Sequence, residues 1–369
     1  MRKWTRVAVL GCAGAFALVV AGQALAAYTP KLVVQMGDAG TTIKLSIPST
    51  DDPTANLTFF APVGTGASLG ATPGSTIGTV EAKATAAALG GATLPLTGTV
   101  QVRAANGTYL SNGQQVPLAA AATACTRTAT HAAFWVLVLT AAGQTLEVPL
   151  LVDPVSTAPL STTVAYSLTV CLPPSDIPQA VGGAAFGAKV IEANFTVKGV
   201  FSPTTSDDNV WRLRATPYNP GKGTANLAAT VETQSFVESG NVTLGVPSRT
   251  LTRLAATFQV SGTVKTRGLS DTSASVSLAR GSAATKLSVF AHPRLKPDGT
   301  FTARFAVRRM LRRAQAFFVQ AVATAPQRDL TTTACKATFG VPCIGATASG
   351  FADTSSVRKI LVPPQPRRR

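Results

Sequence analysis

Histidine, tryptophan and acidic side chains are scarce in this chain. Its 369 residues include 2 His, 3 Trp and 16 Asp or Glu, against 33 Lys or Arg. Two histidines are few for a zinc site and give poor support to a Ser–His pair. Few aromatic rings disfavour a glycan platform, and scattered acids disfavour the paired carboxylates of a glycosidase. We therefore expect no catalytic residue, no metal and no cofactor.

Long apolar segments are also scarce. Beyond residue 26, the longest apolar run covers residues 132–139, which is the length of a strand. A membrane-spanning helix needs about 20 apolar residues. We expect no transmembrane span.

The first 26 residues have the layout of a cleavable secretory signal peptide. A basic start is followed by an apolar stretch over residues 7–21 and by the small-x-small triplet Ala24-Leu25-Ala26. We predict cleavage before Ala27 and a secreted, extracellular protein. The alternative is a lipoprotein, because residues 9–12 resemble a lipobox.

Five cysteines are present, and loss of the signal peptide would leave four. An even number in an oxidising compartment favours disulfides. Sequence order pairs Cys125 with Cys171 and Cys335 with Cys343, although four cysteines allow three pairings. A loop-entropy model gives these links about 4 and about 2.6 kcal/mol of stabilisation. The alternative, a zinc site, has the wrong spacing for paired thiolates.

Positive charge is concentrated in the second half of the chain. Residues 27–200 carry 7 basic and 8 acidic residues, a net charge of −1, whereas residues 201–369 carry 23 and 8, a net charge of +15. A basic half can indicate nucleic-acid binding, but an exported chain meets anionic wall polymers or lipid headgroups instead. We expect no nucleic-acid partner. The alternative is that the charge reflects solubility together with a basic coding bias.

Short apolar or alternating runs, separated by Gly and Pro, predict an all-β protein. We expect two immunoglobulin-like β-sandwich domains, at residues 27–237 and 238–362, followed by a basic disordered tail at 363–369. The first domain is expected to hold strands near residues 32–36, 42–47, 56–61, 96–103, 132–139, 145–152, 164–171, 189–201, 210–215 and 226–233. The second is expected to hold strands near residues 258–264, 274–278, 287–291, 301–307, 317–323 and 357–362.

Two of these segments carry further expectations. Residues 132–139 are apolar on both faces, which indicates a central strand. Residues 326–355 form a connection of unusual length, which a Cys335–Cys343 disulfide would staple.

Residues 260–264 and Asp298-Gly299-Thr300-Phe301 carry a resemblance to the immunoglobulin-like repeats of bacterial surface proteins, which extends over residues 240–326. The amino-terminal half is similar to uncharacterised secreted proteins of high-GC Gram-positive bacteria, in the segments at residues 56–62, 73–80 and 182–189. These resemblances imply export and a β fold. They imply no activity.

Several residues have both a functional and a structural interpretation. Ser68 lies in a G-x-S-x-G pattern, but no helix signal follows it, so we interpret the segment as a flexible loop. His131 and His292 lie at strand ends, where backbone or water would satisfy them. Asp51-Asp52 and Asp207-Asp208 lack the spacing of a calcium loop, and we interpret both as solvated turns.

After removal of the signal peptide, Trp135 and Trp211 remain, and the strand patterns place both in the core. They are therefore not expected to serve as binding platforms.

The densest basic patch consists of Arg304, Arg308, Arg309, Arg312 and Arg313. An amphipathic helix at residues 305–317 would explain the spacing of these arginines. However, apolar and polar residues alternate in the flanking segments, which favours a turn between two strands. In either case the guanidinium groups face water and can hold phosphate with two hydrogen bonds.

We therefore predict a secreted, non-enzymatic protein with a structural or interaction role at the cell envelope. Its basic second domain would bind an anionic cell-wall polymer or another surface protein. The alternative is a secreted hydrolase acting on a glycan or an ester, with a site formed by scattered acids or by Ser68. No oligomeric state follows from the sequence.

Overall fold

The computed structural model describes residues 28–37, 39–141, 143–204, 209–245, 247–267, 274–310 and 312–366. The expected signal peptide, Asp207-Asp208 and the last three arginines lie outside these residues. Within the described ranges, strands dominate and α1 (Leu118–Thr126) is the one α-helix. The prediction of an all-β protein is confirmed.

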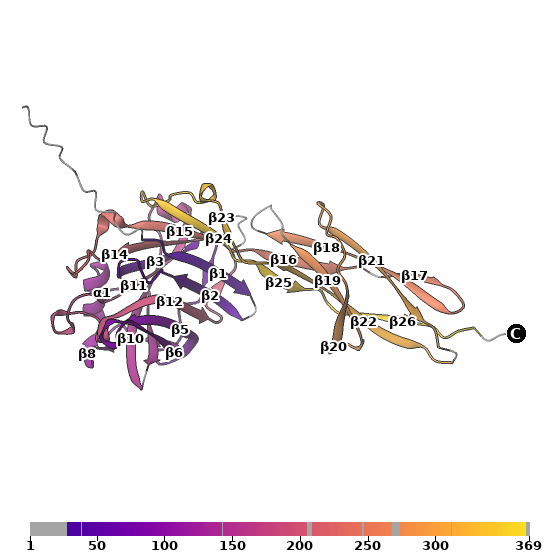
Figure 1. Cartoon of the computed structure of the whole chain (residues 1–369), viewed down its shortest axis with the longest axis horizontal. Coiled ribbons are helices and arrows are strands. Elements are labelled where there is room, and N and C mark those ends of the chain that lie inside the picture. Colours follow the sequence, from indigo (N-terminus) through magenta and orange to yellow (C-terminus); the bar gives the residue numbers. More distant parts are fainter. Residues whose placement is uncertain are drawn as a thin grey trace, which may run out of the picture.

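Two units lie next to each other along the long axis of the molecule (Figure 1). The first unit is built on one sheet of 13 strands. In spatial order the strands are β1 (Lys31–Gly37), β2 (Gly40–Ser46), β12 (Ala188–Val197), β5 (Thr76–Ala86), β6 (Ala92–Arg103), β9 (Ala133–Ala141), β10 (Gln144–Pro154), β11 (Val164–Cys171), β3 (Thr54–Pro62), β14 (Val210–Pro217), β15 (Val231–Phe236), β24 (Cys343–Ala348) and β23 (Arg328–Leu330).

Smaller elements surround this sheet. They are the hairpin of β7 (Thr108–Ser111) and β8 (Gln114–Pro117), the pair of β4 (Gly66–Ala67) and β13 (Phe201–Ser202), and the short 3-10 helices η1 (Ala87–Leu89), η2 (Leu160–Thr162), η3 (Gln179–Val181), η4 (Ala185–Gly187), η5 (Leu227–Ala229) and η6 (Thr332–Ala334).

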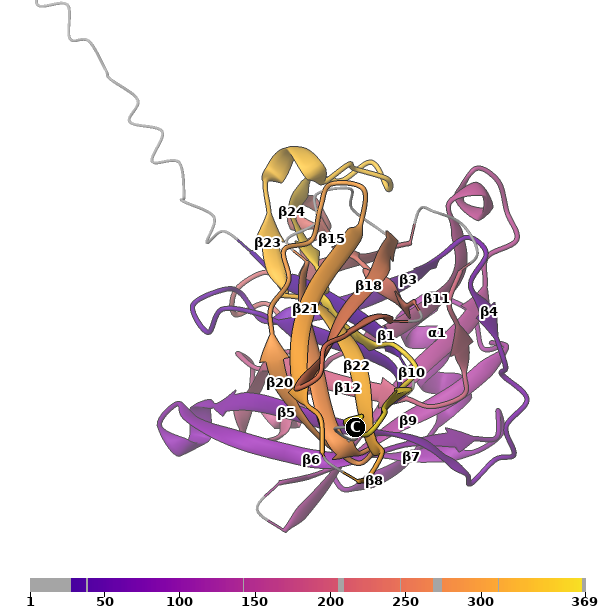
Figure 2. The same cartoon turned by 90° about the vertical axis from the view of Figure 1, so that its right-hand side faces the viewer.

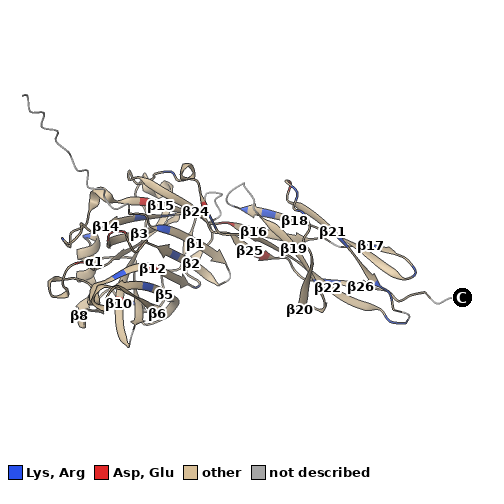
Figure 3. Cartoon of the chain, viewed as in Figure 1, with Lys and Arg blue, Asp and Glu red and all other residues tan. Residues whose placement is uncertain are grey.

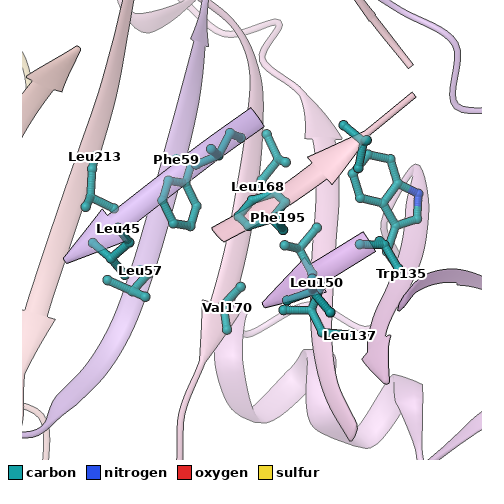
Figure 4. Packing of buried hydrophobic residues seen from close by; sticks show 14 of the residues in the cluster. Leu45, Leu57, Phe59, Trp135, Leu137, Leu150, Leu168, Val170, Phe195 and Leu213 are labelled. Atoms are coloured by element: carbon teal, nitrogen blue, oxygen red, sulfur yellow. The ribbon is translucent and has the colours of Figure 1, made fainter. Parts of the chain in front are cut away.

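Side chains from many strands of the large sheet pack together in one apolar core (Figure 4). Phe59 of β3 and Phe195 of β12 meet edge to face, with ring centroids 5.7 Å apart, although their strands are distant in the sheet order. The ring of Phe201 packs against both Trp135 and Trp211, which are fully buried. Both tryptophans therefore belong to the core, as predicted.

β9 is covered on both faces. Trp135, Leu137 and Leu139 point into the main core. Phe134 and Val136 point outward and pack under Leu118 and Ala122 of α1. β9 also pairs with β6 on one side and β10 on the other, so the prediction of a central strand is confirmed.

The second unit consists of two sheets packed face to face. One contains β16 (Ser239–Leu244), β17 (Ser248–Leu251), β18 (Ala255–Arg267) and β21 (Thr300–Arg308). The other contains β19 (Ser275–Ala283), β20 (Lys286–Ala291), β22 (Gln315–Ala325), β25 (Phe351–Thr354) and β26 (Arg358–Val362). Buried Phe258 and Val260 from the first sheet meet Val319 and Ala321 from the second in a single cluster.

The expected assignment of all of residues 238–362 to the second domain and the expected long connection at 326–355 both require correction. β24 pairs in parallel with β15, and β23 pairs with β24, so residues 328–348 belong to the first unit's sheet. β25 then returns to the second unit, where it pairs with β22. The backbone therefore crosses between the units three times, near residues 238, 326 and 349, and the view from the other end in Figure 2 shows β23 and β24 beside β15.

The segment between β23 and β24 covers the outer face of β14 and β15 through a buried polar network. Glu232 is 0% exposed, and its carboxylate accepts hydrogen bonds from the Thr338 amide at 2.7 Å and from Gln234 Nε2 at 2.7 Å. Arg212 Nε lies 3.9 Å from Glu232 Oε1 and donates to Thr338 Oγ1 at 3.0 Å. The Cys335–Cys343 disulfide closes this covering segment.

Candidate functional site at the basic tip

The arginine cluster lies at the far end of the second unit, where three segments meet. We call residues 251–254, 308–310, 312–314 and 361–366 the tip. The Arg309 amide donates to the Leu254 carbonyl at 2.9 Å, and the Gln365 amide donates to the Met310 carbonyl at 2.8 Å. These bonds join the β17–β18 turn, the β21–β22 connection and the last described residues of the chain. The described residues of that connection form no helix, so the turn interpretation is confirmed.

Arg309 has a structural role that the sequence did not reveal. Its guanidinium group donates to the Thr252 carbonyl at 2.7 Å, to the Pro363 carbonyl at 3.1 Å and to the Pro364 carbonyl. These acceptors occupy Nε, Nη1 and Nη2 and tie the C-terminal segment to the β17–β18 turn. The expectation that Arg309 faces water, free to hold phosphate, was therefore wrong.

Arg304 is also set apart from the cluster. It lies on the outer face of β21, where its Nε donates to Gln259 Oε1 on β18 at 2.8 Å. Four residues along the strand separate it from Arg308, a distance of about 13 Å. It is exposed and basic, but it belongs to the sheet face and not to the tip.

Arg308, Arg312 and Arg313 remain exposed at the tip, and Arg253 of the β17–β18 turn joins them. Within the described part of the chain, no ion pair links any of these four side chains to a carboxylate. Figure 3 shows the same imbalance over the whole second unit, where Lys and Arg recur from β18 onward and acidic positions are rare. The tip therefore carries uncompensated positive charge.

Large apolar side chains are exposed beside these arginines. Leu254 is 62% exposed, Met310 is 57% exposed and Leu361 is 58% exposed, with Leu251 also at the surface. Surface apolar residues are common when scattered singly, but a group of them at one end of a unit indicates an interaction site. The tip thus combines cationic and apolar groups on one small surface.

No protein-family model, curated protein or solved structure matches this chain. Its function is therefore inferred from its own residues and their geometry.

His131 is held by two side chains, whereas the sequence interpretation expected backbone or water to satisfy it. Its Nδ1 lies 2.6 Å from Asp153 Oδ2, and its Nε2 lies 3.0 Å from Thr126 Oγ1. The order Thr–His–Asp matches that of a hydrolase triad. However, the His131 side chain is 1% exposed, and the Thr126 hydroxyl donates to the Ala122 carbonyl at 2.9 Å. The arrangement fastens the end of α1 to β9 and β10.

We expect His131→Ala to lower the free energy of unfolding by about 1–3 kcal/mol, because it removes a buried side chain together with its hydrogen bonds to Asp153 and Thr126. The measurement is urea unfolding followed by tryptophan fluorescence. The matched control is His292→Ala, since His292 is exposed and bonds only Ser277 Oγ at 3.0 Å among the described residues. Its expected loss is below about 0.5 kcal/mol. Equal losses in the two variants would contradict the fastening role.

The remaining candidates from the sequence do not come together. Ser68 follows β4, and its amide donates to the Val200 carbonyl at 2.8 Å, with neither histidine bonded to it in the described structure. Asp51 is buried, and its Oδ2 accepts from the amide and hydroxyl of Thr29. It is therefore not the solvated turn residue that was expected.

Neither a metal-binding cluster nor a membrane-spanning helix occurs among the described residues. No group of three or more His, Cys, Asp or Glu side chains there has the proximity needed to hold a metal ion. No helix there has the length and hydropathy needed to cross a membrane. Both disulfides that sequence order suggests are present, Cys125–Cys171 and Cys335–Cys343.

Proposed function

We propose that this protein is an exported, non-enzymatic binding protein whose tip attaches it to an anionic surface of the cell envelope. The observation that carries the proposal is the exposure of four unpaired arginines beside Leu254 and Met310. Arginine binds phosphate with a planar fork of donors, and apolar side chains add affinity for a surface into which they can insert.

Export is supported by the signal-like first 26 residues and by two disulfides, which persist in oxidising compartments. The face-to-face sheets of the second unit support an immunoglobulin-like character for that unit. The first unit has a single 13-stranded sheet, larger than the seven to nine strands of an immunoglobulin domain, so we keep the proposal for the second unit alone.

The apolar side chains favour an anionic bilayer over a soluble wall polymer. A hydrated polymer offers phosphate or carboxylate but no apolar interior, so exposed leucine and methionine would gain nothing from it. A bilayer offers both. We therefore propose that the tip binds anionic lipid. The experiment must distinguish this binding from binding to a wall polymer.

The test is sedimentation of the protein with vesicles of phosphatidylglycerol and phosphatidylcholine at low and high salt. We expect binding that weakens as salt is raised, because salt screens the arginines. Each basic residue near an anionic surface contributes about 1 kcal/mol. Replacing Arg253, Arg308, Arg312 and Arg313 with Gln is therefore expected to reduce affinity by at least about tenfold.

The matched control removes four basic charges from the opposite end of the same unit, by replacing Lys265, Arg267, Arg294 and Lys296 with Gln. All four side chains are exposed, and the net charge of the two variants is equal. An equal loss of affinity in both would show that charge acts diffusely, and the tip would lose its role. A third variant, Leu254→Ser with Met310→Ser, should weaken binding to vesicles but not retention on an anionic polymer.

A further inference from the structure

The first unit contains a cavity of about 410 Å³ beside the middle strands of its large sheet. Its walls come from Ala84 of β5, Leu96 of β6 and Leu139 of β9 on the inner face, and from Ala121 of α1 on the outer face. Residues from the segment after β11 and from the β7–β8 hairpin close the sides. The size falls in the range of about 300–1,000 Å³ that holds small ligands.

A gap in the sheet makes this cavity. β10 covers Gln144–Pro154 and pairs with β9 along nearly its full length, but it pairs with β11 only from Leu151 to Pro154. The first half of β10 therefore has one unpaired edge. Beyond Cys171, the prolines at 173 and 174 lack the backbone N–H groups that would continue the ladder. The interior is reached between these strands, which explains why inner-face and outer-face residues line one space.

Three of the polar side chains that line the cavity already have partners. Lys189 Nζ donates to the carbonyls of Ser49, at 2.8 Å, and Asp51. Glu147 accepts from Arg103 Nη2 at 2.9 Å and from the Leu110 amide at 2.6 Å. The Tyr218 hydroxyl donates to the Leu172 carbonyl at 2.6 Å.

Burial shifts the pKa of two of these groups. It lowers the pKa of Lys189, against the opposing pull of nearby Asp51, Asp52 and Asp176. It also raises the pKa of Tyr218. What the cavity still offers to a ligand is chiefly alkyl surface from Ala, Leu, Val and Pro.

A disulfide holds the cavity open. Cys125, in the last turn of α1, is bonded to Cys171 at the end of β11, and both residues line the space. The link fixes the helix across the gap at a Cα–Cα distance of 5.7 Å. A preformed apolar cavity binds without paying to order its walls, which favours affinity for a ligand of matching chemistry.

We propose that this cavity binds an aliphatic chain, either a free fatty acid or the acyl chain of a lipid. The chain would lie between β10 and β11 and contact Ala84, Leu139 and Ala121, with its polar end at the solvent side of the gap. The site lies in the first unit and is independent of the tip.

The test uses 1-anilinonaphthalene-8-sulfonate, a dye whose fluorescence rises in apolar sites, on the full chain. We expect saturable binding that dodecanoic acid displaces. Ala121→Trp fills the cavity and should weaken dye binding at least about tenfold, since it replaces the space with an indole ring. Ala120→Trp is the matched control, because Ala120 lies on the same helix, is exposed and does not line the cavity.

A second filling variant, Ala188→Leu on the β12 side, covers the case in which Ala121→Trp fails to fold, which its melting temperature reveals. The dye assay is repeated with the Leu254→Ser, Met310→Ser variant, so that any dye bound at the tip can be subtracted. Displacement by dodecanoic acid assigns a free fatty acid as ligand, and displacement by monomeric dihexanoylphosphatidylcholine alone assigns a lipid acyl chain. The proposal is overturned if neither displaces the dye, or if folded filling variants bind it like the Ala120→Trp control.

Discussion

Replacing Glu232 with alanine is expected to lower the free energy of unfolding by about 3–5 kcal/mol, because it removes one partner of a buried charged network. Glu232 is fully buried and accepts from the Thr338 amide and from Gln234. Without the carboxylate, those donors lose their acceptor, and the buried Arg212 loses the negative charge 3.9 Å from its Nε. The covering segment between β23 and β24 would then lose the hydrogen bonds from the Thr338 and Phe339 amides to β15.

Urea unfolding at neutral pH measures this loss. The control is Glu192→Ala, which removes an ion pair with Lys83 at 2.7 Å in which both side chains are about half exposed. Exposed pairs contribute about 0–1 kcal/mol, so the control should lose little. If the two variants differ by less than about 1 kcal/mol, the network around Glu232 does not hold the segment in place.

Removing the Cys125–Cys171 disulfide, by replacing both cysteines with serine, is expected to destabilise the protein by about 4 kcal/mol. The link spans 46 residues, so its loss greatly enlarges the freedom of the unfolded chain. The same change at Cys335 and Cys343, which lie 8 residues apart, should cost less, about 2.6 kcal/mol.

The two disulfide variants control each other, because each replaces two sulfurs with two hydroxyls. Their urea midpoints are compared with that of the wild-type protein under oxidising conditions. A larger loss from the short loop than from the long one would contradict the loop-entropy explanation. In that case the buried network beneath Cys335 would be the main source of the stability.

Local alternation predicted most strands, since it depends only on neighbouring residues. β11 was placed at its observed bounds, Val164–Cys171, and β9 was recognised as central from its two apolar faces. β5 was missed because its buried positions are mostly alanine, a residue without strong strand preference. α1 was missed because it has neither a side-chain cap nor an acidic first turn.

Features that depend on distant pairing had no signal in the sequence. β24 joins β15 across more than 100 residues, and nothing local distinguishes such a strand from a loop stapled by a disulfide. Likewise, Arg253 joins Arg308 at the tip only because the Arg309 amide bonds the Leu254 carbonyl. The sequence predicted the basic character of the second half. It did not predict the hydrogen bonds of Arg309 to three carbonyls, or the exposed apolar side chains at the tip. The cavity depends on the unpaired edge of β10 and on the packing of α1 across it, and the prolines at 173 and 174 alone do not predict that arrangement.

The three backbone crossings between the units bear on how the protein resists proteolysis. A cut near residue 326 or 349 leaves the units joined by other crossings. A cut near residue 238 severs the first crossing, yet the carboxy-terminal fragment still carries β24, which pairs with β15 of the other unit. A single nick therefore releases neither unit, and the bidentate pair of Arg328 and Glu238, with contacts of 2.9 and 2.8 Å, lies at the same junction. If the tip attaches the protein to a surface as proposed, the first unit would therefore stay attached after a single cut at one of these crossings by an extracellular protease.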